Sequence, residues 1–207
     1  MTKKPNRFIS ETYMEMLELP VFEEYTFWEL LQKRIIDFNQ SVDSSLVERA
    51  IIQILKWNQE DDGAQEKDPD ETRKPITILL NTDGGDVFTG LVLCDVIKQS
   101  KTPVNIDVVV WAGSMGSLIC AVGHRRRAWP HSNFLIHSGQ MNIQGDSDKV
   151  EDLMKYAKQV KGKQMKDLLK EHTNITDKLY KKKERADWWI GAQEALDLGL
   201  IDEIIGG

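Results

Sequence analysis

The chain has 207 residues, of which 41% are hydrophobic and 29% charged, a composition typical of one folded domain and not of a disordered segment. Its 33 acidic and 27 basic side chains give a formal net charge of −6, which disfavours nucleic-acid binding because nucleic-acid-binding domains are usually basic. Cys94 and Cys120 lie in apolar runs, so we expect two buried, reduced thiols in a cytoplasmic protein.

Residues 1–28 predict an N-terminal arm, and residues 29–207 a folded domain. Acidic residues such as Glu11 and Glu15 follow the basic start, where an export signal needs an apolar block. The most membrane-like run, Val108–Gly123, contains three glycines and is too short to cross a bilayer. We therefore expect neither export nor a membrane span.

The first part of the domain predicts a strand, a helix and a polar loop. A helical pattern changes at Ile35-Ile36 into a short apolar run, which predicts the first strand. Apolar residues then recur at helical spacing over residues 46–55. Asn58–Arg73 is almost wholly polar and predicts a solvated insertion loop.

The centre of the chain alternates strands with helices. Ile76–Leu80 and Val104–Trp111 are rich in β-branched residues, as buried strands are, and Thr89–Gln99 between them predicts a helix. Met115–Val122 predicts a short buried helix, and Asn133–Ile136 another strand.

The last part predicts a long amphipathic helix over Asp148–His172, a helix over Ala192–Leu198 and a turn into a short strand. Strands that alternate with helices indicate an α/β fold with a largely parallel sheet.

Ala112-Gly113-Ser114-Met115-Gly116 connects a predicted strand to a predicted helix. A serine in that turn exposes its hydroxyl, and the amide of the next residue lies at the positive end of the helix dipole. An acyl-transfer nucleophile and its oxyanion donor need both features. Taken alone, the pentapeptide favours the simpler interpretation that Ser114 caps the helix.

Asp83-Gly84-Gly85-Asp86 also follows a strand, and its glycines can turn backbone amides toward a ligand. A plain tight turn is an equally good interpretation. Gly85 and Gly90 have the spacing of a phosphate-binding loop, but Leu91-Val92 replace the Lys-Ser or Lys-Thr that such a loop requires. We therefore expect no nucleotide cofactor.

His137 is the best candidate for a general base among the four histidines, since it ends an apolar strand, although a structural histidine is the simpler interpretation. His124 leads the basic run Arg125–Arg127 and is expected in a solvated loop. No spacing of histidines, cysteines and carboxylates indicates a metal site. The order serine, then histidine, then a later acid disfavours α/β-hydrolases and chymotrypsin-like enzymes.

Taken together, these motifs resemble the Clp protease proteolytic subunit (ClpP) family over about residues 30–205. The resemblance rests on five segments in the order of the family: Leu31–Ile36, Asn81–Val87, Ala112–Gly116, Leu135–His137 and the C-terminal block 186–202. It implies a ClpP/crotonase-like fold of repeated β/α units from which a long helix protrudes.

The resemblance also implies roles for individual residues. Ser114 would be the nucleophile, His137 the general base and Asp187 the acid that orients the imidazole. The backbone amides of Gly85 and Met115 would form the oxyanion hole. Three further residues would bind the substrate strand: Asp86, Val87 and Gln140. Without the resemblance, Asp177 or Glu184 could equally be proposed as the acid.

The implied function is a serine endopeptidase that cuts unfolded polypeptides inside stacked seven-membered rings of this chain, bridged by the helix at 148–172. An ATP-dependent unfoldase would feed the rings, and no cofactor, metal, nucleic acid or membrane is implied. Three alternatives stay open: a phage-type capsid-maturation protease of the same fold, a crotonase-like acyl-CoA enzyme, and an inactive ring subunit that acts as a scaffold or regulator.

Overall fold

The computed structural model describes residues 22–137, 146–183 and 186–206. Most of the predicted arm therefore lies outside the described residues, and so do Gln140 and Glu184. The end of the arm belongs to helix α2, Phe22–Gln32, which crosses the boundary expected at residue 28.

Within the described residues, seven strands form one sheet in which most neighbours run parallel. The strands are β1 Ile35–Asn39, β2 Ile76–Thr82, β3 Val104–Gly113, β4 Arg125–Ala128, β5 Asn133–Ile136, β6 Trp188–Gly191 and β7 Glu203–Ile204. The helical segments that follow α2 are η1 Val47–Ile51, α3 Ile52–Lys67, α4 Val87–Gln99, α5 Met115–Ala121, α6 Ser147–Gln159, η2 Val160–Met165, α7 Lys166–His172, α8 Asp177–Lys183 and α9 Ala192–Asp197. The predicted α/β fold is confirmed.

The sheet divides along β3. Residues 105–108 of this strand pair with β4, whereas residues 111–113 pair with β5. On its other side β3 runs parallel to β2, and β2 runs parallel to β1. Because β5 and β6 are antiparallel, the carboxyl ends of β2, β3 and β5 lie at the same edge as the amino end of β6.

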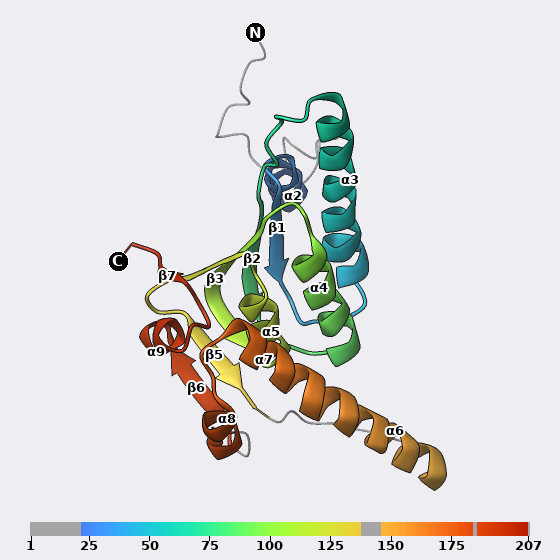
Figure 1. The fold of residues 1–207 in the computed structure, drawn as a ribbon, viewed down its shortest axis with the longest axis vertical. Coiled ribbons are helices and arrows are strands. Elements are labelled where there is room, and N and C mark those ends of the chain that lie inside the picture. Colours follow the sequence, from blue (N-terminus) through green and yellow to red (C-terminus); the bar gives the residue numbers. More distant parts are fainter. Residues whose placement is uncertain (1–21, 138–145, 184–185, 207) are drawn as a thin grey trace.

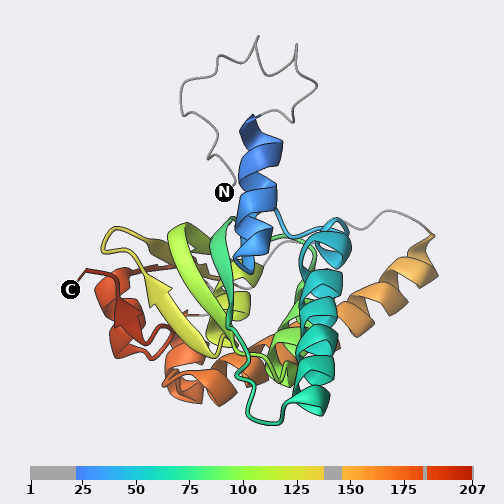
Figure 2. The ribbon, with the colours of Figure 1, turned by 90° about the horizontal axis from the view of Figure 1, so that it is seen from above.

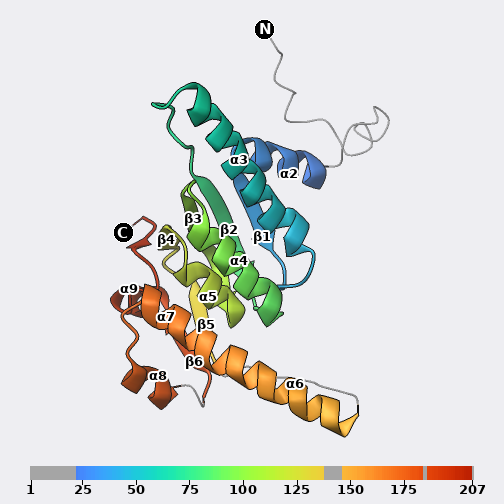
Figure 3. The same cartoon turned by 45° about the vertical axis from the view of Figure 1, so that its right-hand side comes forward.

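Helices cover the sheet and bury its apolar residues. Figure 3 shows α3, α4 and α5 along one face. Every second residue of β2 is buried from Ile76 to Thr82, and α5 is buried along its whole length. The uncharged run Val108–Gly123 therefore contains a core helix, as expected, but its strand part is only partly buried, since Val109 and Val110 are exposed. Within the described ranges, no helix is both long and apolar enough to span a bilayer.

The long helix predicted over Asp148–His172 is confirmed as the continuous run α6–η2–α7. Its α7 end lies against the body of the molecule, whereas α6 extends away from it (Figure 1). Figure 2 shows α2 and α6 projecting from the body in different directions.

The solvated loop expected over Asn58–Arg73 is wrong for residues 58–67, which form the second half of α3. Their polar side chains have partners from distant segments. Asn58 donates to Ser100 Oγ at 2.7 Å and accepts from the Lys101 and Thr102 amides. Asp61 is buried and accepts two hydrogen bonds of 2.7 Å from Arg34.

The basic run Arg125–Arg127 forms strand β4, which the sequence patterns did not predict, whereas His124 is exposed in the preceding loop, as expected. Each arginine has an acidic partner: Glu203 for Arg125, Asp202 for Arg126 and Asp107 for Arg127. His124, just before the strand, accepts a hydrogen bond from the Val104 amide through Nδ1. The positive charges of β4 are tolerated in the sheet because acidic side chains of neighbouring segments neutralise them.

Asp61→Asn should lower the free energy of unfolding at pH 7 by about 2–3 kcal/mol, because it leaves the largely buried Arg34 without its partner charge. Hydrogen bonds from Arg34 hold the pKa of Asp61 below its ordinary value of 3.8. The stabilisation is therefore complete above the unfolded-state pKa and is lost as the pH falls through the folded-state pKa. Urea unfolding at neutral and acidic pH measures both effects.

Glu60→Gln is the matched control, since the exposed Glu60 carboxylate lies 4.0 Å from the same guanidinium. It should change the free energy of unfolding by less than about 0.5 kcal/mol. Equal losses of unfolding free energy in the two variants would show that the buried Arg34–Asp61 pair is no more stabilising than the exposed Arg34–Glu60 pair.

Candidate active site

Three strand ends bring Ser114, His137 and Asp187 to one edge of the sheet. β3 and β5 run parallel with Gly113 opposite Leu135, so Ser114 and His137 follow at the same end. β6 returns antiparallel to β5 with Trp188 opposite Ile136, so Asp187 precedes β6 beside His137.

The His137 and Asp187 side chains form an ion pair when the imidazole is protonated. Asp187 Oδ1 lies 3.8 Å from His137 Nδ1, which is beyond hydrogen-bond length. Asp187 is the more exposed partner, with 61% of its side chain accessible against 24% for His137. A shift of about 1 Å by the carboxylate would form a hydrogen bond.

Ser114 occupies a backbone conformation that is rare for residues other than glycine, with φ +51° and ψ −114°. Neighbouring hydrogen bonds hold it there: its amide donates to Leu135 O at 2.8 Å and its carbonyl accepts from Ser117 N at 3.1 Å. Ser114 sits at the start of α5, but its side chain makes no capping hydrogen bond. The interpretation of Ser114 as a helix cap is therefore wrong.

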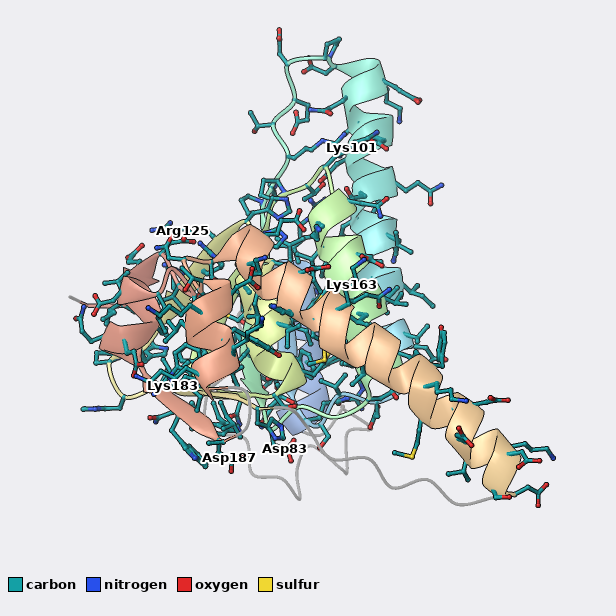
Figure 4. The ribbon with its side chains drawn as sticks, turned by 60° about the horizontal axis from the view of Figure 1, so that its bottom comes forward. Asp83, Lys101, Arg125, Lys163, Lys183 and Asp187 are labelled. Atoms are coloured by element: carbon teal, nitrogen blue, oxygen red, sulfur yellow. The ribbon has the colours of Figure 1, made fainter. Side chains whose placement is uncertain are left out.

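The glycine turn after β2 lies directly against the Ser114 turn. Gly84 and Gly85 have φ values of +99° and +146°, which disfavour any side chain. A methyl group on Gly84 would lie 2.7 Å from Ser114 Cβ and 3.0 Å from the Met115 amide nitrogen. Figure 4 shows Asp83, at the start of this turn, at the same end of the molecule as Asp187.

Val42 holds the glycine turn in place. Its amide donates to Gly84 O at 2.8 Å, and its carbonyl accepts from Asp86 N at 2.7 Å. A methyl group on Gly85 would lie 2.3 Å from that same carbonyl oxygen. Sequence reasoning missed Val42, because a lone valine in a polar segment carries no motif.

Among the described residues, none accepts a hydrogen bond from the backbone amide of Gly85 or Met115. Met115 opens α5, where helix geometry leaves the first amides without an intrahelical acceptor. Its side chain is buried and lies against α4, since a methyl group on Gly90 would come within 2.3 Å of Met115 Cγ. Two backbone donors on adjoining turns are thus available near Ser114.

Of the three residues expected to bind substrate, Asp86 and Val87 lie where α4 begins. The Asp86 carboxylate caps that helix by accepting from Thr89 N at 2.7 Å. Val87 is half-buried, and Gln140 lies outside the described residues.

Asp177 does not lie in this site. It is paired with Lys166 and Lys170 at 2.5 and 2.9 Å, and hydrogen bonds from these lysines lower its pKa to about 2. Among the acids expected from the sequence, Asp187 is the one that the described geometry brings to His137.

Neither cysteine offers an alternative nucleophile. Both are free and buried, as expected, and burial raises the pKa of the Cys94 thiol and brings that of Cys120 to about 12. The described side chains contain no cluster of three or more histidine, cysteine or carboxylate groups suited to a metal ion.

Comparison with known proteins places the sequence of this chain in one family. A model of the Clp protease family matches residues 23–207. The ATP-dependent Clp protease proteolytic subunit 2 of Thermobifida fusca is 30% identical over 188 residues, which cover 90% of this chain and 87% of the relative. The ATP-dependent Clp protease proteolytic subunit of Deinococcus radiodurans is 30% identical, with 85% and 82% covered, and that of Porphyromonas gingivalis is 28% identical, with 99% and 88% covered.

These matches confirm the resemblance and decide against a crotonase-like acyl-CoA enzyme. The family model extends over the strand ends, both turns and the long helix. The chain belongs to the Clp protease family and is a protease of the serine type.

Proposed function

We propose that this chain is a serine endopeptidase that hydrolyses peptide bonds of unfolded polypeptides, with Ser114 as nucleophile, His137 as general base and Asp187 as the orienting acid. One observation carries the proposal. The carboxyl ends of β3 and β5 and the amino end of β6 meet at the same edge, and the serine there is held in a strained turn without a side-chain capping bond. Strain of this kind concentrates at functional sites.

The reaction follows from this arrangement. Ser114 Oγ attacks the peptide carbonyl carbon while His137 takes its proton, and the peptide C–N bond then breaks as His137 protonates the leaving amine. Water hydrolyses the acyl-enzyme by the same proton transfers in reverse. Asp187 closes the 3.8 Å separation to His137 and fixes the imidazole tautomer.

The oxyanion of the tetrahedral intermediate would accept hydrogen bonds from the amides of Gly85 and Met115. Both amides lack an acceptor among the described residues, and Val42 fixes the turn that carries the Gly85 amide. One such donor typically contributes about 3–4 kcal/mol of transition-state stabilisation. The substrate strand would bind Asp86 and Val87, and Gln140 is the third residue that the resemblance assigns to it.

The assembly would consist of stacked seven-membered rings of this chain, in contact through α6 and α7. The projection of α6 from the body and its exposed Leu153, Met154 and Tyr156 support this role. An ATP-dependent unfoldase would supply substrates, since the relatives are named ATP-dependent and this chain lacks the residues of a phosphate-binding loop. We place the assembly in the cytoplasm, where reduced cysteines are the norm.

Ser114→Ala should abolish labelling by a fluorophosphonate probe and lower kcat for a short peptide by about 10³-fold or more, because no other group replaces the attacking oxygen. Sedimentation should show the same assembly as the wild type. Ser147→Ala, at the exposed start of α6, is the control and should label normally. Cleavage that survives in Ser114→Ala would reject the nucleophile, and an unlabelled, inactive wild type would favour a scaffold subunit.

Asp187→Asn should lower kcat by up to about 10⁴-fold, since an amide stabilises the wrong imidazole tautomer. Asp177→Asn tests the competing acid and should leave kcat within about twofold, because Asp177 pairs with lysines away from His137. Steady-state peptide hydrolysis measures both variants. The reverse ranking would assign the third catalytic role to Asp177.

Gly85→Ala should lower kcat by about 100-fold, because its methyl group collides with Val42 O and displaces an oxyanion donor. Gly63→Ala is the matched control, since a methyl group there meets nothing within 4 Å. It lies within α3 and should raise the free energy of unfolding by about 0.5–1 kcal/mol without changing kcat. Full activity in Gly85→Ala would exclude this turn from the oxyanion hole.

A further inference from the structure

Two tryptophans from distant parts of the chain meet beside the candidate site. The rings of Trp111 in β3 and Trp189 in β6 have centroids 5.2 Å apart and an interplanar angle of 36°. β5 lies between these strands, with Leu135 opposite both Gly113 and Trp189. The two indoles therefore reach across β5, and we call this contact the tryptophan bridge.

One end of the bridge lies against the Ser114 turn. A methyl group on Gly113 would lie 2.6 Å from Trp111 Nε1 and 2.9 Å from Asp83 O. The Trp111 indole thus rests on the backbone immediately before Ser114 and borders the start of the glycine turn. Gly113 is required at this position because the indole occupies the space that a side chain would need.

The other end of the bridge belongs to the strand that carries Asp187. β6 has four residues, and among the described strands it pairs with β5 alone. Trp188 and Ile190 point into the core and are 3% and 1% exposed, whereas Trp189 lies on the opposite face and is 61% exposed. Its contact with Trp111 is a side-chain link from this short edge strand to β3 on that open face.

Strand β5, which lies beneath the bridge, is hydrogen-bonded to the Ser114 turn and leads directly to His137. Leu135 O accepts from the Ser114 amide at 2.8 Å and from Ser117 Oγ at 3.2 Å, and His137 follows two residues later. A link over β5 therefore joins the backbone of the nucleophile turn to the strand start that holds Asp187. Aromatic pairs favour a defined mutual geometry, which suits such a link.

We infer that the tryptophan bridge is a positioning element that sets the approach of Asp187 to His137 relative to the Ser114 turn. This inference rests on the proposed function, because it needs the Asp187–His137 contact to matter for catalysis. The 3.8 Å separation must close by about 1 Å, and misplacement by that amount in an active site lowers rates by about 100-fold. Neither tryptophan touches the substrate in this role.

The test compares variants of the full chain by kcat and KM for a short peptide and by the rate of fluorophosphonate labelling. Trp189→Ala removes the bridge, Trp189→Phe keeps an aromatic ring in contact with Trp111, and Trp129→Ala removes a tryptophan of similar exposure outside the bridge. The exciton couplet in the far-ultraviolet circular dichroism spectrum reports whether the two indoles remain paired. Trp189→Leu replaces Trp189→Ala if the latter does not fold.

Trp189→Ala should lower kcat by about 10- to 100-fold with KM within about twofold of the wild type. Trp189→Phe should recover kcat to within about threefold, and Trp129→Ala should match the wild type in kcat and in the couplet. A merely structural role would not produce loss of kcat at constant KM with recovery by phenylalanine.

Three outcomes would overturn the inference: wild-type kcat in Trp189→Ala despite loss of the couplet, a change confined to KM, or a Trp189→Phe variant as slow as Trp189→Ala. A change confined to KM would assign Trp189 to substrate contact. Ser114→Ala in the same assay distinguishes failure of the bridge inference from failure of the proposed function. If it is inactive while Trp189→Ala is fully active, only the bridge fails, whereas an active Ser114→Ala removes the proposed function itself.

Discussion

The hydrogen bond from the Ser114 amide to Leu135 O is the contact on which the geometry of the site depends. It exists because β3 exchanges partners, pairing with β4 along its first half and with β5 along its second. β5 could not lie beside Gly113 if β4 continued to the end of β3. The division of the sheet thus brings His137 next to the serine turn, and the antiparallel return of β6 adds Asp187.

Sequence patterns predicted the parts of the fold whose signals are local. Apolar runs located β2, β3 and β5, since each of these strands buries several apolar residues in the core. The same reasoning failed for the second half of α3, whose polar residues suggested a solvated loop, and it missed β4, whose residues are mostly charged. Their partners, among them Arg34 for Asp61 and Asp202 for Arg126, are distant in the sequence, so no local pattern could predict them.

In the candidate site, too, some residues could be predicted from the sequence and others could not. Ser114, His137 and Asp187 lie in motifs with a fixed order, and that order was sufficient to predict the family from the sequence. Val42 acts through its main chain, for which the identity of the residue carries no signal. The contact between Trp111 and Trp189 depends on strand register across β5, which becomes defined when three strands pair.

Arg126 links the order of synthesis to the order of folding. Its guanidinium donates to the carbonyls of Ala121, His172 and Gly199 and pairs with Asp202, near the end of the chain. A nascent chain can form β1, β2 and β3 from earlier segments, but Arg125 and Arg126 in β4 lack their acidic partners until the segment with Asp202 and Glu203 has been synthesised. This side of the sheet can therefore be completed only after β7 has been synthesised, and a chain truncated shortly before Asp202 would leave Arg125 and Arg126 without compensating charges.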